Sequence, residues 1–203
     1  MTEQQRFTVI ATFPEFELRR YDACVLAEVE VAGSMDSAGT RAFRRLAGYI
    51  GGRNRARRSL AMTAPVVQAA AGRTIAMTSP VVQEEQGDRH VVGFVMPAGE
   101  TTATLPEPED ATVSLREVPE ELAAAMRYSG RWTESAYRAR VAHLQDAVAR
   151  AGLTVAGRPR WARFDPPWTP WFLRHNEVVL PVAAADDPHT ETGRVRVPRT
   201  RPE

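Results

Sequence analysis

Few side chains in this sequence carry chemistry of their own. All 26 basic residues are arginine, which excludes a Schiff-base lysine, a pyridoxal-phosphate anchor and the lysine of a phosphate-binding P-loop. Cys24 is the single cysteine of the chain, so neither a disulfide framework nor a cluster of thiolate metal ligands can form. It lies in an apolar run, which favours a small buried hydrophobe over a nucleophile.

The motifs that mark common active sites are absent from the sequence. We find no His-Glu-X-X-His, Gly-X-Ser-X-Gly, Cys-X-X-Cys or Gly-X-Gly-X-X-Gly. The carboxylates form no sequence pair typical of acid–base catalysis. The histidines are scattered along the chain: His90, His143, His175 and His189. We therefore expect no enzymatic activity.

Length and composition favour one domain with a substantial core, because 43% of the 203 residues are hydrophobic. We expect this domain to span residues 1–183, and residues 184–203, which lack periodicity, to form a disordered tail. The net charge of +1 gives no reason to expect a nucleic-acid or membrane partner. Because no stretch has the pattern of a signal peptide or a membrane span, we expect a cytoplasmic protein. The sequence leaves the oligomeric state open, with a monomer favoured.

One phrase, Ala-Met-Thr-X-Pro-Val-Val-Gln, occurs twice between residues 60 and 83 and predicts a β-hairpin. A turn near residues 71–72 would set Val66 opposite Met77, and Met62 opposite Val81. Cross-strand partners share a face of a sheet, so both methionines would line the same side. Two interpretations remain open: the methionines fill gaps in a core hairpin, or they form a soft apolar wall for a flat ligand.

The remaining pattern predicts strands and two amphipathic helices. Period-two alternation and β-forming residues indicate strands over residues 16–21, 25–31, 90–97, 113–118, 125–129, 161–164 and 177–182. Apolar residues at helical spacing indicate helices over residues 36–50 and from a Thr133 cap to Gly152. Each half of the chain thus places one helix among antiparallel strands, which predicts an α+β sheet or distorted barrel carrying two helices.

Several of these segments together resemble the SOUL heme-binding protein family, over residues 13–183. The similar segments occur in the family's order: residues 17–21, 42–50, the twin Met-Thr-X-Pro-Val phrases, 94–97, 105–108, 128–130, 165–170 and 174–178. The resemblance implies a distorted antiparallel β-barrel of two pseudo-symmetric halves flanked by two α-helices. It also implies that heme or a related tetrapyrrole binds in a shallow apolar groove between helix 36–50 and loop 166–174.

The resemblance places two kinds of side chain in this groove, cations for the propionates and apolar groups for the ring. The expected cations are Arg41, Arg44, Arg45 and Arg174. The expected apolar lining is Tyr49, Met62, Met77, Trp168, Trp171 and Phe172. Thr169 stands in this loop where other members have a basic residue.

The iron would have few ligands to choose from. Some family members have a histidine in the N-terminal strand, but this chain has Arg20 in that neighbourhood and no histidine before His90. His175 is the candidate nearest to the groove, although a hydrogen-bonding role is favoured for it. We therefore expect non-catalytic binding that buffers, carries or presents the tetrapyrrole. The alternatives are a tetrapyrrole-modifying enzyme, for example one that removes the metal, and an effector-binding sensor module.

Overall fold

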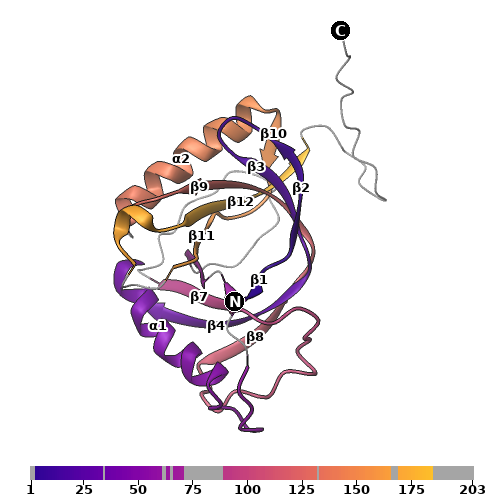
Figure 1. The fold of residues 1–203 in the computed structure, drawn as a ribbon, viewed down its shortest axis with the longest axis vertical. Helices are drawn as coiled ribbons and strands as arrows, with labels where there is room; N and C mark the ends of the chain where they lie inside the picture. The colour runs from indigo at the N-terminus through magenta and orange to yellow at the C-terminus, as the bar shows by residue number, and fades with distance from the viewer. Residues whose placement is uncertain are drawn as a thin grey trace, which may run out of the picture.

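Most strands of the described chain pair into one long, curled antiparallel sheet, with two helices outside the curl (Figure 1). Two short strands, Glu3–Gln4 and Thr63–Ala64, form a separate parallel pair. The computed structural model describes residues 3–33, 35–60, 63–64, 66–70, 89–131, 133–165 and 169–184. The elements in chain order are β1 (Glu3–Gln4), β2 (Phe7–Thr12), β3 (Glu17–Tyr21), β4 (Cys24–Ala32), α1 (Met35–Ile50), β5 (Thr63–Ala64), β6 (Val66–Ala70), β7 (Arg89–Val95), β8 (Val113–Val118), β9 (Glu121–Tyr128), α2 (Glu134–Arg150), β10 (Leu153–Val155), β11 (Arg160–Arg163), η1 (Trp171–Leu173) and β12 (Asn176–Ala184).

The order of the strands shows that the sheet is built from two equivalent halves. Its path is β2-β3-β9-β12-β11-β6-β7-β4-β8. The unit β4-α1-β6-β7 and the unit β9-α2-β11-β12 meet at the β6–β11 pair. From this pair outward, the strand order is β6-β7-β4 in the first unit and β11-β12-β9 in the second, so equivalent strands occupy equivalent positions. The strand that precedes each unit in the chain pairs with the other unit: β3 pairs with β9, and β8 pairs with β4. This arrangement confirms the predicted α+β fold, as a half-barrel of two pseudo-symmetric halves with two helices.

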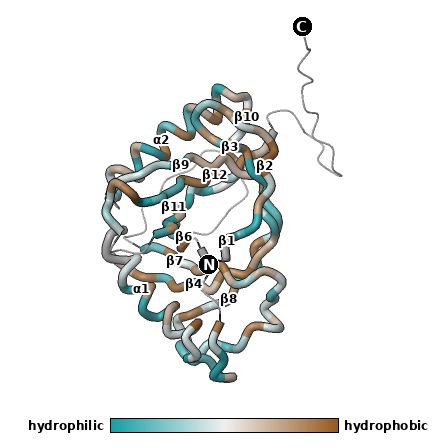
Figure 2. The backbone as a smooth tube through the Cα atoms, viewed as in Figure 1, coloured by the Kyte–Doolittle hydropathy of each residue, from teal (hydrophilic) through white to brown (hydrophobic). Residues whose placement is uncertain are grey.

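Each helix buries one apolar stripe against its own half of the sheet. Leu46 of α1 and Leu144 of α2 are both fully buried. Leu46 belongs to a cluster with residues of β4 and β7, and Leu144 to one with residues of β9, β11 and β12. Figure 2 shows hydrophilic and hydrophobic residues intermixed along both helices, as expected for helices with one buried side. Neither helix in the described ranges is long and apolar enough to cross a bilayer.

Local signals predicted most element boundaries. The predicted helix 36–50 is observed as Met35–Ile50, and Thr133 caps α2 by accepting a hydrogen bond from the backbone N–H of Ala136 at 3.3 Å. The strand predicted over residues 113–118 is observed with the same bounds. β9 begins at Glu121, four residues before the predicted start. β2 and β10 were not predicted, and both have exposed residues that weaken the alternation expected of a strand.

The strand pairing predicted from the repeated phrase is wrong for Val66. This residue pairs with Phe94 of β7 on one side and with Arg163 of β11 on the other. Both edges of β6 are therefore occupied there, and Met77 cannot lie opposite Val66. Because β6 lies where the two halves of the sheet meet, its pairing with β7 and β11 prevails over the hairpin pairing predicted from the repeated phrase. Met62 and Met77 lie outside the described residues, so the rest of the predicted hairpin stays a prediction.

A buried ion pair joins the N-terminal and C-terminal parts of the sheet on the face opposite the helices. Arg19 of β3 donates two hydrogen bonds to Glu177 of β12, at 2.8 and 3.1 Å. The two side chains are only 8% and 3% exposed. They reach each other across β9, where the residues that face them, Ala123 and Ala125, are small and buried. His175 adds a third contact, with its Nε2 at 3.0 Å from a Glu177 oxygen.

The surroundings of Glu177 keep it ionised. Burial by itself would raise the pKa of this carboxyl, but hydrogen bonds from His175 and Arg19 outweigh burial and hold the pKa below its usual range. The contribution of this carboxylate to stability is therefore complete above the pKa of an unfolded glutamate, about 4.3, and is lost as the pH falls through the lower folded pKa.

We predict that Glu177→Gln lowers the free energy of unfolding by roughly 3–5 kcal/mol at neutral pH, because it removes the buried counter-charge of the Arg19 guanidinium and leaves only the more exposed Glu17 beside it. Glu17→Gln is the matched control, since Glu17 also contacts Arg19 but is 39% exposed, and it should cost less than about 1 kcal/mol. Urea unfolding at several pH values measures both. The gap between wild type and E177Q should narrow below about pH 4, and equal losses in the two variants would contradict the assignment.

We also predict that the two helices contribute equally to the free energy of unfolding. Leu46→Ala and Leu144→Ala each remove a fully buried side chain from one half, so each should lower the free energy of unfolding by about 2–5 kcal/mol. Arg44→Ala, on the exposed side of α1, should change it by less than about 0.5 kcal/mol. A large loss in only one of the leucine variants would show that the halves are not energetically equivalent.

Candidate ligand-binding site

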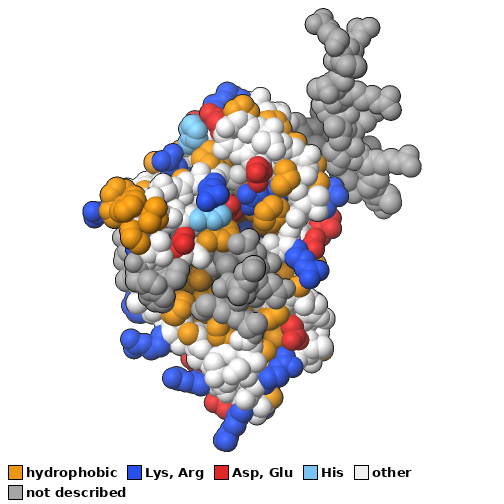
Figure 3. Space-filling view, viewed as in Figure 1, with side chains coloured by type: hydrophobic (Ala, Val, Ile, Leu, Met, Phe, Trp, Pro, Cys, Tyr) orange, Lys and Arg blue, Asp and Glu red, His pale blue; other side chains and the backbone are white. Residues whose placement is uncertain are grey.

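Three consecutive large apolar side chains are exposed on the turn before β12. Trp171, Phe172 and Leu173 are 50%, 58% and 65% exposed. They form the 3₁₀ turn η1, closed by a hydrogen bond from the Leu173 N–H to the Pro170 carbonyl at 2.9 Å. Hydrophobic side chains stand out at the corresponding edge of the space-filling view, with arginine beside them (Figure 3). Exposed apolar side chains that lie together in this way mark a surface for a ligand or partner.

Contacts on both sides hold η1 in place. The Gly130 N–H donates to the Trp171 carbonyl at 3.1 Å, and the Arg131 guanidinium lies 5.7 Å from the centre of the Trp171 indole. Arg174 Nε donates to the carbonyl of Thr169 at 2.8 Å. Thr169 and Arg174 of the predicted site therefore act first on the turn itself, by fixing its backbone.

Hydrogen bonds and strand pairing link η1 to α1. Buried Asn176 of β12 donates to the Gly130 carbonyl at 3.4 Å, and it pairs across the sheet with Arg163 of β11. Arg163 in turn lies under α1, because a methyl group at Gly39 would lie only 2.8 Å from Arg163 Nη1. The absence of a side chain at Gly39 thus lets α1 approach the end of β11 closely.

Arg163 supplies a positioned cation between these two elements. Its guanidinium stacks on Trp161 at 3.9 Å and donates to Gln68 Oε1 at 2.8 Å. The side chain is half-buried, and stacking and hydrogen bonding together favour one orientation. Sequence reasoning missed this residue. The alternation of Arg-Trp-Ala-Arg places Arg163 and Trp161 on one face, but only the strand order shows that this face carries the helices.

The three arginines predicted on α1 do not converge on η1. Arg41 donates to the Ala32 carbonyl at the end of β4, and Arg45 donates to Thr112 Oγ1 at 3.2 Å, just before β8. Both therefore lie on the flank of α1 that faces away from Gly39. At 100° per residue, Arg44 projects from the side of the helix opposite the sheet. The flank nearest to Arg163 instead carries Phe43, which is 40% exposed and meets Phe94 edge-on at 5.4 Å.

The other predicted lining residues divide into two groups. Tyr49 is 2% exposed and donates to the Pro106 carbonyl at 2.8 Å, so it belongs to the core of the first half. Met62, Met77 and Trp168 lie outside the described residues. The surface formed by Gly39, Phe43, Arg163 and residues 171–173 is called the α1–η1 site below.

His175 is already engaged in the sheet. Its Nε2 contacts Glu177, and its ring stacks on Phe164 at a centroid distance of 4.1 Å and an angle of 6°. Ligation of iron through Nε2 would require loss of the Glu177 contact, so the structure favours the hydrogen-bonding role. Within the described ranges, no group of three His, Cys, Asp or Glu side chains could hold a metal ion. Burial raises the pKa of the Cys24 thiol and so disfavours a thiolate ligand.

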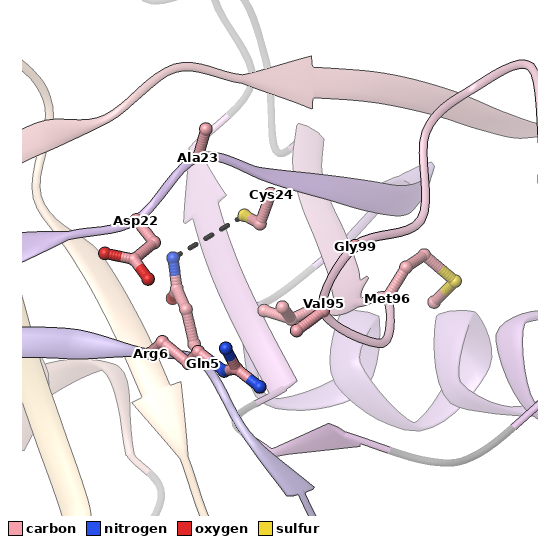
Figure 4. Close-up of a pocket in the computed structure, with 9 residues that line it drawn as sticks. Gln5, Arg6, Asp22, Ala23, Cys24, Val95, Met96 and Gly99 are labelled. Carbon is pink, nitrogen blue, oxygen red and sulfur yellow. Dashed lines mark hydrogen bonds between the residues drawn. The ribbon is translucent and has the colours of Figure 1, made fainter.

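Two pockets lie elsewhere on the protein and are small. One has a volume of about 130 Å³ and is lined by residues around the β3–β4 turn, including Asp22 and Cys24, where Gln5 Nε2 lies 3.5 Å from the Cys24 sulfur (Figure 4). The other, beside Arg19 and Glu177, has about 10 Å³. Pockets for drug-sized ligands have about 300–1,000 Å³. Neither pocket, as it stands, can enclose a tetrapyrrole.

Comparison with solved structures identifies the fold. The C-terminal domain of EcmrR is 14% identical, with a TM-score of 0.60, over 84% of this chain and 98% of that one. A hydrolase from Listeria innocua is also 14% identical, with a TM-score of 0.60, over 86% and 94% of the two chains. An uncharacterized conserved protein from Listeria innocua is 13% identical, with a TM-score of 0.54, over 90% and 93%. At these identities the likeness shows the fold alone.

Comparison of sequences adds the family. No curated protein matches the chain closely enough to count as a relative. The family model described as SOUL heme-binding protein matches residues 2–181, which is most of the chain and includes both helices and η1. The chain therefore belongs to the SOUL heme-binding protein family.

Proposed function

We propose that this protein binds heme or a related tetrapyrrole at the α1–η1 site and releases it unchanged. The observation that carries the proposal is the exposure of Trp171, Phe172 and Leu173 on a fixed turn beside a positioned cation, in a chain of a heme-binding family. A planar macrocycle requires apolar surface for its faces and cations for its carboxylates. Phe43 and η1 supply the first, and Arg163 and Arg174 supply the second.

A comparison of the hydrophobic gain with the cost of association indicates that the arginines determine the affinity. Contact with one face of a tetrapyrrole removes roughly 400 Å² from water, worth on the order of 10 kcal/mol at about 25 cal/mol per Å². Association costs of about 4–15 kcal/mol offset most of this gain. Without a strong bond from the protein to iron, charge-assisted hydrogen bonds have to supply the remainder. We therefore expect a Kd of about 1 μM that weakens with added salt.

The surroundings of the site support binding rather than turnover. The polar side chains placed there, Arg163, Arg174 and Asn176, do not exchange protons at neutral pH. Tyr128 lies opposite Asn176 on the same face, and burial raises the pKa of its phenol, so it keeps its proton. The nearest titratable pair, His175 and Glu177, lies on the opposite face of the sheet, because Asn176 and Glu177 alternate along β12. Glu177 of this pair also binds Arg19.

We predict that hemin added to the purified protein produces a saturable shift of its Soret band, and that Trp171→Ala and Arg163→Gln each raise the Kd about tenfold. Arg163→Gln should also flatten the salt dependence, because it removes one charge from the site. Arg55→Gln is the control, since this exposed arginine pairs with Glu107 on a loop beyond the C-terminal end of α1. The absence of saturation at tens of micromolar, or wild-type affinity in both site variants, would contradict the proposal.

A separate prediction concerns turnover. Hemin incubated with the protein for hours should be recovered with its iron and its mass unchanged, since none of the side chains that the structure describes at the site exchanges protons at neutral pH. Mass spectrometry and absorbance of the extracted pigment measure this outcome. Steady accumulation of a metal-free or opened macrocycle, above the level in a protein-free sample, would make the protein an enzyme instead.

A further inference from the structure

The turn η1 exposes more apolar surface than one flat ligand can cover. Residues of a 3₁₀ turn follow one another at about 120°, so Trp171, Phe172 and Leu173 point in three different directions. The rings of Trp171 and Phe172 accordingly meet at 86° with their centres 5.6 Å apart. A macrocycle against one side of this turn leaves the other sides in water. Phe172 and Leu173, which have the greater exposure, therefore require a second partner.

The charge around this turn has one sign. Residues 127–131 and 169–176 meet through the Gly130–Trp171 and Asn176–Gly130 hydrogen bonds. They contain no Asp or Glu. Arg131 and Arg174 lie beside η1, whereas Arg127 lies opposite Glu177 in the sheet and so points to the other face. The first acid on either side of segment 169–176 is engaged, since Asp165 accepts from the His175 N–H and Glu177 binds Arg19. The net charge of the whole chain, +1, conceals this local excess of positive charge.

We propose that η1 docks the protein onto an anionic lipid surface. Phe172 and Leu173 enter the boundary between headgroups and acyl chains, and the Trp171 indole lies at headgroup level, where such rings concentrate. Arg131 and Arg174 face the lipid phosphates. Neither helix of the described chain can cross a bilayer, so this contact is peripheral.

The shape of the turn favours a bilayer over a protein partner. A stable protein interface covers about 800 Å² on each partner with closely complementary surfaces. Three side chains radiating from one turn form a small convex tip, which a fluid lipid interface accommodates without a matching cavity. The lipid contact was not expected from the near-neutral total charge, because that number averages over the whole surface.

Sedimentation with lipid vesicles tests the inference in the absence of any pigment, so its outcome is separate from that of the hemin titration. The full chain should sediment with vesicles containing about 30% phosphatidylserine and much less with pure phosphatidylcholine. The double variant Phe172→Ser, Leu173→Ser should bind anionic vesicles about tenfold more weakly. Arg131→Gln should weaken binding to anionic vesicles severalfold and leave binding to phosphatidylcholine unchanged.

Val155→Ser provides the matched control, because it removes a 40% exposed apolar side chain from β10, at a distance from the tip in the sequence and on another strand. It should bind as wild type does. Sedimentation of the wild type with neither vesicle, or equal binding by wild type and the double variant, would overturn the proposal and leave a protein partner as the candidate for η1. Circular dichroism confirms that the variants are folded, as expected for exposed positions.

Discussion

The Arg19–Glu177 ion pair is the constraint on which the rest of this structure depends. It connects residues 158 positions apart in the chain and ties β3 to β12 across β9. Such a bridge is possible only if the intervening strand presents small side chains, and β9 presents Ala123 and Ala125. Two charges taken out of water are costly unless their hydrogen bonds are complete. Here Glu177 is satisfied by Arg19 and His175, so the pair fixes the register of three strands, and with it the position of Asn176 and of η1 at the start of β12.

The pseudo-symmetry of the sheet explains why the candidate site lies where it does. The two helix-bearing units meet at β6 and β11, so the outer face of these central strands lies between α1 and α2. At Gly39 the helix has no side chain, and Arg163 occupies the space. In the second half, the loop before β12 carries η1 to the same end of the strands. A cation and an apolar turn from distant parts of the chain are thereby brought together.

Sequence patterns predicted what is decided locally and failed where long-range pairing decides. Thr133 as a helix cap, the α1 stripe through Leu46 and the strand over residues 113–118 each depend on a few neighbouring residues. The partners of Val66 could not be predicted in this way, because two distant strands compete with the local turn and win. The same limit applies to the site. Trp171, Phe172 and Arg174 were predicted from the family resemblance and lie in the candidate site, whereas Arg163 and Phe43 were added only once the strand order was known. Arg41 and Arg45 lie on the flank of α1 that faces away from Gly39.

Alternation along β12 separates stability from ligand binding within two residues. Glu177 points to the face that holds the buried ion pair, and Asn176 points to the face that holds η1 through Gly130. The carboxylate that could act as a base is therefore sequestered from the surface where a tetrapyrrole or a lipid would lie, and its depressed pKa keeps it a structural anion. In the proposed function, a surface with arginines and aromatic rings, backed by a rigid strand, holds the macrocycle. If the proposed lipid contact also forms, the same turn offers one side to the ligand and another to the lipid, because its three side chains point in different directions.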